Sequence, residues 1–501
     1  MFFKNKSKWF LTILIVAATS SSSLFCKAQD DGSVSADDDD SMSLMSSDVT
    51  GWTYPAPKAH DPPESVSDGK LHFAMIDPEA LRENKKHMHD YDRELQHALW
   101  FLKKKADRYV TNTTTFSVIE KSIAVPGNDS HDYMSLARYF WPNESQPNGM
   151  PYIRHDGRVN PEIEKVPDYQ HFRNLVKHVQ YLSLAYHFFD NETYAAKATQ
   201  RIHDWFIDSK TRMNPHLQYA SLVRGYNTGR AKGIIDFHVL PDLMDSMAIL
   251  QYSKSWKEGM NRHIRYWFAQ YIEWLIKSPN GIFEKESHNN HGTYYDVQRV
   301  AIYRFLGKKD LAQQVLQNAT ASRIAQQILS SGEMYQETAR PFSWFYSIFN
   351  LKALFQLAHM GRQVGVDLHQ YKTVDGKSIR SAVDFMLPYA ANESTWNFYN
   401  SGGFDSSYIL SNVLNWAYIA YANETYLAMA RKLGVEHSHP YNITRLSLPW
   451  RALGDHSDRA MEGFQPASPP PPPSNDASSS FYYTTLVGWI AATLLGFIFT
   501  Q

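Results

Sequence analysis

Three stretches of the sequence carry side chains that could act chemically on an anion. The first runs from His288 to Gly292 and reads HNNHG, directly before an apolar helical pattern that begins near Thr293. Amide and imidazole donors there would lie at the amino end of a helix, where free N–H groups and the helix dipole also favour an anion. Two alternatives stay open. One is a metal site formed by His288 and His291, although no carboxylate stands at a familiar zinc spacing. The other is simple helix capping with surface histidines.

The second stretch, ETARPFSWFY, runs from Glu337 to Tyr346. Pro341 suits the first turn of a helix and keeps Arg340 extended just before it. Tyr346 would then lie about one and a half turns into that helix. Taken alone, a tyrosine among phenylalanines is typical of a core, and a single arginine is typical of a surface ion pair.

The third stretch is the loop from Arg224 to Arg230, RGYNTGR, which has two arginines and two glycines. It lacks the spacing of a phosphate-binding loop, so it is predicted to be an anion-contacting turn or a plain loop. Two other segments, Tyr139–Pro142 and Tyr152–Arg154, combine aromatic and basic side chains that could stack on sugar rings.

The elements that must position these residues are helices. Apolar residues recur at spacings of three and four from about residue 90 to residue 435, and alternating strand patterns are scarce. We therefore predict an all-α fold, an α/α toroid or incomplete α/α barrel, as a single catalytic domain over residues 61–464. The predicted helices are 93–109, 169–189, 192–207, 240–252, 257–276, 294–306, 309–329, 341–360, 379–389 and 411–433.

Taken together, the chemical segments resemble one family. Asn289–Gly292, followed 49 residues after His291 by Arg340 and 55 residues after it by Tyr346, resembles the alginate lyase domain family of polysaccharide lyases. Three further segments carry the same resemblance: Tyr139–Pro142, Tyr152–Gly157 and Asn227–Arg230. The resemblance covers roughly residues 130–390. Within this family, the sequence is similar to the branch that includes alginate and glucuronan lyases with helical toroid folds.

This resemblance implies β-elimination at a uronic acid of a 4-linked polyuronate, either alginate or glucuronan. Asn290, His291 and Arg340 are expected to neutralise the uronate carboxylate and so stabilise an enolate-like transition state. Tyr346 is the expected base and acid where the C5 proton and O4 lie on the same face of the ring, as in mannuronate and glucuronate. Its pKa of about 10 would then have to fall. For guluronate, where the two groups lie on opposite faces, His291 is the stronger candidate base.

Four further residues, Arg230, Tyr139, Trp141 and Asn227, are candidates for binding neighbouring uronates. This arrangement needs no metal or organic cofactor, and the sequence carries no acidic calcium-binding loop. The expected partner is therefore an anionic polysaccharide.

Two other functional classes remain open from the sequence. A helical-toroid glycoside hydrolase would need a pair of carboxylates. The acids available for it are Asp236, Asp296, Glu333 and Glu337. A non-catalytic polyuronate-binding protein at the cell surface is the third hypothesis, and it would release no product.

Composition excludes several classes. The 501 residues are 43% hydrophobic and 20% charged, with 50 basic and 51 acidic side chains. That balance excludes a disordered chain, a collagen-like repeat and a histone-like binder, so we expect no nucleic-acid partner. We expect a monomer.

The amino-terminal segment is predicted to be a signal peptide, residues 1–28. Lys4, Lys6 and Lys8 form a basic region, Trp9–Ala18 is apolar, and Cys26–Ala28 offers a cleavage site. A retained signal anchor is the alternative. Cys26 is the only cysteine, so the mature chain would have neither a disulfide nor a thiol nucleophile.

The remaining segments outside the catalytic domain have their own composition. Residues 29–60 form an acidic, Ser- and Asp-rich lead-in, residues 465–485 a Pro- and Ser-rich linker, and residues 486–501 an apolar tail. Small residues, a spacer and such a tail predict a glycosylphosphatidylinositol (GPI) anchor, with a single transmembrane helix as the alternative. We expect a secreted glycoprotein at the extracellular face of the plasma membrane or in the cell wall. Eight N-x-S/T sequons support this, at Asn112, Asn128, Asn143, Asn191, Asn318, Asn392, Asn423 and Asn442.

Overall fold

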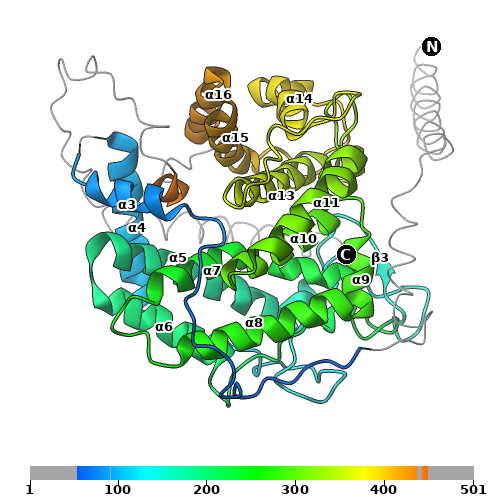
Figure 1. The fold of residues 1–501 in the computed structure, drawn as a ribbon. Helices are drawn as coiled ribbons and strands as arrows, with labels where there is room; N and C mark the ends of the chain where they lie inside the picture. The colour runs from blue at the N-terminus through cyan, green and yellow to red at the C-terminus, as the bar shows by residue number, and fades with distance from the viewer. Residues whose placement is uncertain (1–53, 91, 437–442, 449–501) are drawn as a thin grey trace, which may run out of the picture. The chain divides into compact units, whose positions relative to one another are not determined.

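Helices make up almost all of the regular structure in the computed structural model, which describes residues 54–90, 92–436 and 443–448 (Figure 1). All of these residues fall within one compact unit. The α-helices of this part of the chain are α3 (Pro78–Lys86), α4 (Arg93–Val110), α5 (Asp168–Phe189), α6 (Glu192–Phe206), α7 (Leu240–Leu250), α8 (Met260–Lys277), α9 (Pro279–Lys285), α10 (Asn290–Phe305), α11 (Lys309–Ala319), α12 (Tyr335–Thr338), α13 (Ser343–Arg362), α14 (Ile379–Ala391), α15 (Ser407–Tyr421) and α16 (Glu424–Glu436).

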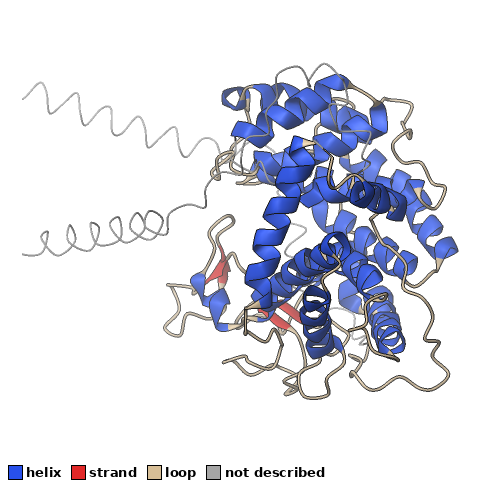
Figure 2. Cartoon of the chain, turned by 90° about the vertical axis from the view of Figure 1, so that its left-hand side faces the viewer, coloured by secondary structure: helices blue, strands red, loops and turns tan. Residues whose placement is uncertain are grey.

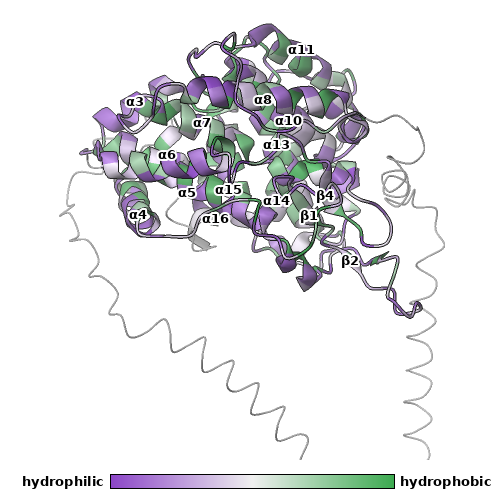
Figure 3. Cartoon of the chain, turned by 90° about the horizontal axis from the view of Figure 1, so that it is seen from below, coloured by the Kyte–Doolittle hydropathy of each residue, from purple (hydrophilic) through white to green (hydrophobic). Residues whose placement is uncertain are grey.

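The helices pack in two layers. One layer is the series α5, α7, α10, α13 and α15, in which each helix packs against the next. A second helix backs most members of this series: α6 packs on α5, α11 on α10, and α16 on α15. α7 is buried along nearly its whole length, and hydrophilic residues predominate on α3 and α6 at the outside (Figure 3). The arrangement is an α/α toroid, so the predicted fold class is confirmed.

Four short strands lie on one side of the helices, joined by loops (Figure 2). β1 (Met134–Leu136) pairs in parallel with β4 (Tyr219–Leu222). β2 (Phe140–Trp141) pairs antiparallel with β3 (Ile153–Arg154). Because these pairings join distant segments, the two aromatic and basic segments singled out in the sequence become neighbours.

Two helices that carry predicted catalytic residues begin at other residues than the sequence predicts. α10 begins at Asn290 instead of near Thr293, because the side chain of Asn289 accepts a hydrogen bond from the His291 N–H and caps the helix. α13 begins at Ser343, so Pro341 precedes the helix instead of occupying its first turn. Tyr346 therefore lies only one turn into α13.

Three other differences concern helix ends and short helices. The predicted helix 411–433 is two helices, because Ala422 adopts a left-handed conformation with φ of 50° between α15 and α16. The apolar pattern continues across this break, which hides it. The predicted helix 309–329 ends as α-helix at Ala319 and continues as a π-helix, η3 (Thr320–Ala325). α3 and α9 were not predicted; both have proline in the first turn and are shorter than an amphipathic pattern needs.

The predicted signal peptide, the linker and the apolar tail lie outside the described residues, as does most of the lead-in. Within the described ranges, no helix is long and apolar enough to cross a membrane. Of the eight sequon asparagines, seven fall among the described residues, and none of those seven is buried.

Candidate active site

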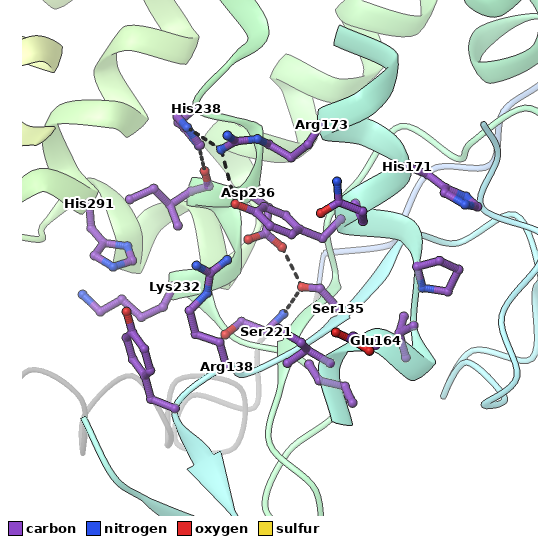
Figure 4. Close-up of a pocket in the computed structure, with 18 of the residues that line it drawn as sticks. Ser135, Arg138, Glu164, His171, Arg173, Ser221, Lys232, Asp236, His238 and His291 are labelled. Carbon is purple, nitrogen blue, oxygen red and sulfur yellow. Dashed lines mark hydrogen bonds between the residues drawn. The ribbon is translucent and has the colours of Figure 1, made fainter. Parts of the chain in front are cut away.

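A cavity of about 990 Å³ is lined by α5, α10, α13, the 3-10 helix η2 (Ala231–Phe237) and the segment that runs from β1 into β2 (Figure 4). Among the described residues, its wall carries six basic side chains and two carboxylates. The bases are Arg138, Arg154, Arg173, Arg230, Lys232 and Arg340, and the acids are Glu164 and Asp236. Such a wall attracts an anionic ligand and disfavours a cationic one.

Tyr346 presents its hydroxyl to this cavity from the first turn of α13. Its Oη lies 3.2 Å from Nη2 of Arg340 and 3.0 Å from Oη of Tyr139. The Arg340 guanidinium also lies over the Tyr346 ring, 4.0 Å from the centroid. Burial raises the pKa of Tyr346, and the charge of Arg340 opposes that rise without cancelling it. The expected fall in this pKa is therefore wrong for the substrate-free site, because desolvation outweighs the neighbouring cation.

Arg340 is fixed by a carboxylate from a distant loop. Its Nε and Nη2 donate to the two oxygens of Asp156 at 3.1 and 3.0 Å, a bidentate pair. Arg154 also contacts Asp156, at 3.1 Å. Burial alone would lower the pKa of Arg340, but Tyr346, Asp156 and Glu337 together raise it, so the guanidinium stays charged.

A loop after α14 holds the segment between Arg340 and Tyr346 in place. Ser401 N–H donates to the Pro341 carbonyl at 2.7 Å, and the Ser343 hydroxyl donates to the Tyr399 carbonyl at 2.8 Å. Phe342 lies against Gly157 on one side and Gly402 on the other. A Cβ added at either glycine would come within 3.0 Å of the Phe342 ring. The close packing fixes where Arg340 leaves the chain before α13.

Asn290 is held by a buried carboxylate on α12. Its backbone N–H and its Nδ2 donate to the two oxygens of Glu337 at 2.6 and 2.8 Å, and Glu337 is fully buried. Asn290 Oδ1 has no hydrogen-bond partner among the residues that the structure describes. Burial raises the pKa of Glu337 to about 7, although both hydrogen bonds from Asn290 act to lower it.

His291 faces the cavity one residue further along α10 (Figure 4). Its Nδ1 lies 2.6 Å from Oε1 of Glu284, a fully buried carboxylate on α9. Because a carboxylate accepts, Nδ1 carries the proton and Nε2 is the nitrogen left for a ligand. Burial lowers the pKa of His291, and Glu284 opposes that shift. The imidazole therefore rests neutral, with an acceptor available to the cavity.

The four predicted substrate-binding residues divide into two groups. Tyr139 and Arg230 line the cavity, and the Arg230 guanidinium lies over the Phe140 ring at 4.9 Å. Trp141 and Asn227 do not line it. Trp141 donates its indole N–H to the Arg158 carbonyl, and Asn227 accepts from the Val223 N–H within its own turn. Their assignment to substrate stays a prediction.

Comparison with known proteins decides the family. The family model described as alginate lyase matches residues 117–396, more than half of the chain. An alginate lyase from Bacteroides ovatus is 31% identical, with a TM-score of 0.71, over 75% of this chain and 99% of that one. The chain belongs to the alginate lyase family. It is a polysaccharide lyase.

Other solved structures are more distant. Alginate lyase A1-III from Sphingomonas species A1 is 17% identical, with a TM-score of 0.48, over 71% of this chain and 91% of that one. A variant of A1-III complexed with a tetrasaccharide is 16% identical, with a TM-score of 0.47, over 72% and 92%. No curated protein matches the chain.

Several residues of the lyase site were not singled out from the sequence. Lys232 lies in η2, lines the cavity and donates to the Ser287 hydroxyl at 2.9 Å. Arg138 directly precedes Tyr139 and lies over the ring of Tyr169, 5.1 Å from its centroid. Glu284 holds His291, and the only local signal for it is that an acid stands seven residues before that histidine. Glu337 is a candidate from the sequence only as a hydrolase acid, whereas in the structure it holds Asn290.

The four acids considered for a hydrolase do not form a pair in this cavity. Asp236 alone among them lines it, and it accepts from the Tyr133 and Ser135 hydroxyls. Asp296 is paired with Arg323 at 2.8 Å. Glu337 lies behind Asn290, and Glu333 accepts from the Thr338 hydroxyl. The geometry therefore gives no support to the hydrolase.

The histidines considered as a zinc pair have different surroundings. His288 is exposed and contacts Gln326, whereas His291 lines the cavity against Glu284. A separate group of ligand-type side chains, His203, Asp204 and Asp208, meets at the end of α6, and none of them lines the cavity.

Proposed function

We propose that the enzyme cleaves a 4-linked polyuronate, alginate or glucuronan, by β-elimination in this cavity. The observation that carries the proposal is the position of the Tyr346 hydroxyl. It lies on the cavity wall within hydrogen-bond reach of both Arg340 and Tyr139. A phenol next to a fixed guanidinium can exchange a proton while its charge is stabilised.

The substrate carboxylate is neutralised first. The C5 proton of a uronate is weakly acidic until charge on the adjacent carboxylate is stabilised. Asn290 and Arg340 supply that stabilisation, and His291 adds to it only where its ring is charged, because the neutral ring offers the cavity an acceptor at Nε2. Asn290 and Arg340 are held rigidly by Glu337 and Asp156, so little reorganisation is needed as the enolate-like charge develops.

The elimination then breaks two bonds and forms two. A base takes the C5 proton, and the C5–H electrons form a C4=C5 double bond as the C4–O4 bond breaks. The departing O4 takes a proton from an acid. One product has a new reducing end that carries the departed oxygen O4. The other product ends in a 4,5-unsaturated uronate, which absorbs in the ultraviolet.

The resting protonation states define two routes. For guluronate, neutral His291 Nε2 takes the C5 proton and the protonated Tyr346 gives its proton to O4. For mannuronate and glucuronate, Tyr346 serves both steps and must first lose its proton. The proton leaves by a relay, in which Tyr346 passes its proton to Tyr139 Oη, 3.0 Å away, while Tyr139 gives its own proton to water, and Arg340 then holds the Tyr346 phenolate. In this route His291 acts as an imidazolium that donates to the substrate carboxylate.

The test is ultraviolet absorbance with time on polyglucuronate, polymannuronate and polyguluronate. We expect a rise with at least one of them and a loss of about 10²–10⁴-fold in Tyr346→Phe, the range for removal of a general acid or base. Tyr252→Phe is the matched control, because Tyr252 is 62% exposed and is not one of the cavity residues. It should retain wild-type activity.

Two outcomes contradict the proposal. Saturated reducing ends that accumulate without an absorbance rise would indicate a hydrolase, and carboxylates such as Asp236 would become the targets. Tight binding of a polyuronate without any product would indicate a binding protein.

We further propose that the enzyme is a secreted, monomeric glycoprotein held at the outer face of the plasma membrane by a GPI anchor. The composition of residues 1–28 and 465–501 and the accessible sequons support this proposal. Release of the protein from intact cells by a phosphatidylinositol-specific phospholipase is the expected result. Retention after that treatment, with extraction only by detergent, would indicate a transmembrane tail.

A further inference from the structure

The cavity extends away from the catalytic residues along one stripe of α5. His171, Asn174 and His178 follow each other at spacings of three and four, so they lie on one face of the helix. The stripe reaches about 13 Å from Tyr169 to His178, at 1.5 Å per residue. Thr114 and Phe116 pack opposite it, since the Phe116 ring lies 5.9 Å from His171 and 5.1 Å from His178. We call His171, Asn174, His178, Thr114 and Phe116, together with Glu164 at their edge, the α5 arm.

None of the six basic residues of the cavity wall belongs to the α5 arm. Arg173 is also on α5, but its Nη1 points toward His238 and lies 3.2 Å from the Nε2 of that residue, whereas His171 and Glu164 lie further to the right in the view (Figure 4). Glu164 is exposed and makes no ion pair within the described part of the chain. A carboxylate there repels a uronate.

One buried cation lies behind the arm. Arg201 is 3% exposed and stacks on the Phe116 ring at 4.5 Å. Its N–H groups donate to the Thr114 and Asn112 carbonyls and to the Asn112 side chain. Arg201 is not one of the residues that line the cavity, so it offers no donor to a ligand there.

The hydrogen-bonding groups of the arm suit hydroxyl groups. His171 Nδ1 lies 2.8 Å from the Ser117 carbonyl, so Nδ1 carries a proton and Nε2 is the nitrogen left for a ligand. His178 is 8% exposed, and neither of its nitrogens has a hydrogen-bond partner within the described ranges. Burial lowers the pKa of His178 to about 3, which keeps its ring neutral. Asn174 accepts from Gln170 and keeps its own amide N–H groups for a ligand.

We propose that the α5 arm is a subsite for an uncharged sugar. The enzyme then acts on a polymer in which the cleaved uronate has a neutral sugar near it along the chain. This inference rests on the proposed β-elimination. A sugar hydroxyl can both donate to an imidazole and accept from an amide. A carboxylate can only accept, so it would leave the acceptor nitrogen of the neutral His178 ring unsatisfied, and Glu164 would repel it.

The experiment uses polyglucuronate in which part of the carboxyl groups has been reduced to neutral glucose. Products released by the full-length enzyme are sequenced by mass spectrometry, and cleavage is followed by absorbance. We expect glucose to be enriched at least threefold at one fixed position relative to the cleaved bond. Asn174→Leu and His178→Phe should each remove most of this enrichment. Glu164→Gln should lower it by admitting glucuronate at the same position. His288→Phe is the control, because His288 is exposed outside the cavity, and it should keep the wild-type pattern.

Three results overturn the inference. One is glucose placed at random around the cleaved bonds, or depleted there, while cleavage itself proceeds. That result would leave the proposed β-elimination standing. A second is enrichment that persists unchanged in both Asn174→Leu and His178→Phe, which would place the neutral subsite elsewhere. A third is the absence of unsaturated products from every polymer, which overturns the β-elimination and the subsite with it. Asn174 is only half-buried, so its variant keeps the test valid if His178→Phe fails to fold.

Discussion

The substitution Glu284→Gln separates the two proposed roles of His291. Glu284 is fully buried, and its Oε1 lies 2.6 Å from Nδ1 of His291. A glutamine amide oxygen can still accept the Nδ1 proton, so the orientation and tautomer of the ring are kept. What is lost is the negative charge that stabilises the imidazolium.

The expected shift in the pKa of His291 can be worked out from its hydrogen bond to residue 284. A bond to a charged partner contributes about 1.5–3 kcal/mol and a neutral one about 0.5–1.5 kcal/mol, a difference of roughly 1–1.5 kcal/mol. That difference lowers the pKa of His291 by about one unit, because one unit is 1.36 kcal/mol. Burial already lowers this pKa, and Glu284 is the group that opposes the shift. Above that pKa, the fraction of imidazolium therefore falls about tenfold.

The consequence depends on the substrate. On polymannuronate or polyglucuronate, His291 must be charged to donate to the substrate carboxylate. We expect kcat/KM to fall about tenfold and the alkaline limb of the pH profile to move about one unit lower. On polyguluronate, neutral His291 is the base. The loss of kcat/KM should therefore be smaller, and the alkaline limb of the pH profile should not move to lower pH. The assay is initial absorbance rate against pH for each polymer.

The control is Glu333→Gln, an acid of the same type that is not one of the cavity residues. It should leave both profiles in place. An equal loss on all polymers, or an unmoved alkaline limb on polyglucuronate, would refute the reasoning about the charge of His291. A lowered melting temperature alone would not produce a shift in the limb.

Three further predictions follow from contacts around the site. Asp156→Asn removes the bidentate carboxylate from Arg340, and we expect kcat to fall by 10-fold or more with little loss of stability, measured by absorbance assay and thermal unfolding. Glu337 has its pKa raised to about 7 by burial, above its unfolded value of 4.5, so its stabilising contribution is present at low pH and lost as pH rises from about 4.5 to 7. Glu337→Gln should remove up to about 3 kcal/mol of that pH dependence, and a slope equal to wild type in urea unfolding at several pH values would contradict this. Gly402→Ala would press a methyl group into the Phe342 ring, and we expect a loss of about 1–3 kcal/mol in unfolding free energy together with lower kcat; full activity would show that the loop does not position the helix start.

Local patterns were sufficient for much of the helical framework. Helices such as α4, α5 and α6 are predicted to within one residue at each end, because each combines an amphipathic repeat with a clear stop. The pattern fails where a turn interrupts a continuous apolar stripe. Ala422 breaks α15 from α16 through its backbone conformation alone, and no change of hydrophobicity marks it.

The candidate site shows the same division. The sequence indicated Asn290, His291, Arg340 and Tyr346 through their resemblance to a family, and the structure places all four in or beside one cavity. Local sequence patterns offer little sign of the carboxylates that hold these four residues in place. Asp156 meets Arg340 across 184 residues of chain, and Tyr139 meets Tyr346 across 207. Such pairings depend on how helices and loops pack, which a local pattern does not encode.

The sequence by itself therefore determined the helical class of the fold, the family and the residue types that can neutralise a uronate and move a proton. Only the tertiary structure decided their chemical states. It showed that burial outweighs Arg340 and raises the pKa of Tyr346, and that Glu284 sets which nitrogen of His291 is available. It also decided that six basic side chains from distant segments of the chain gather on the wall of one cavity. Desolvation and distance are properties of the packed chain, because both depend on which residues surround a group in space and not on its neighbours in sequence.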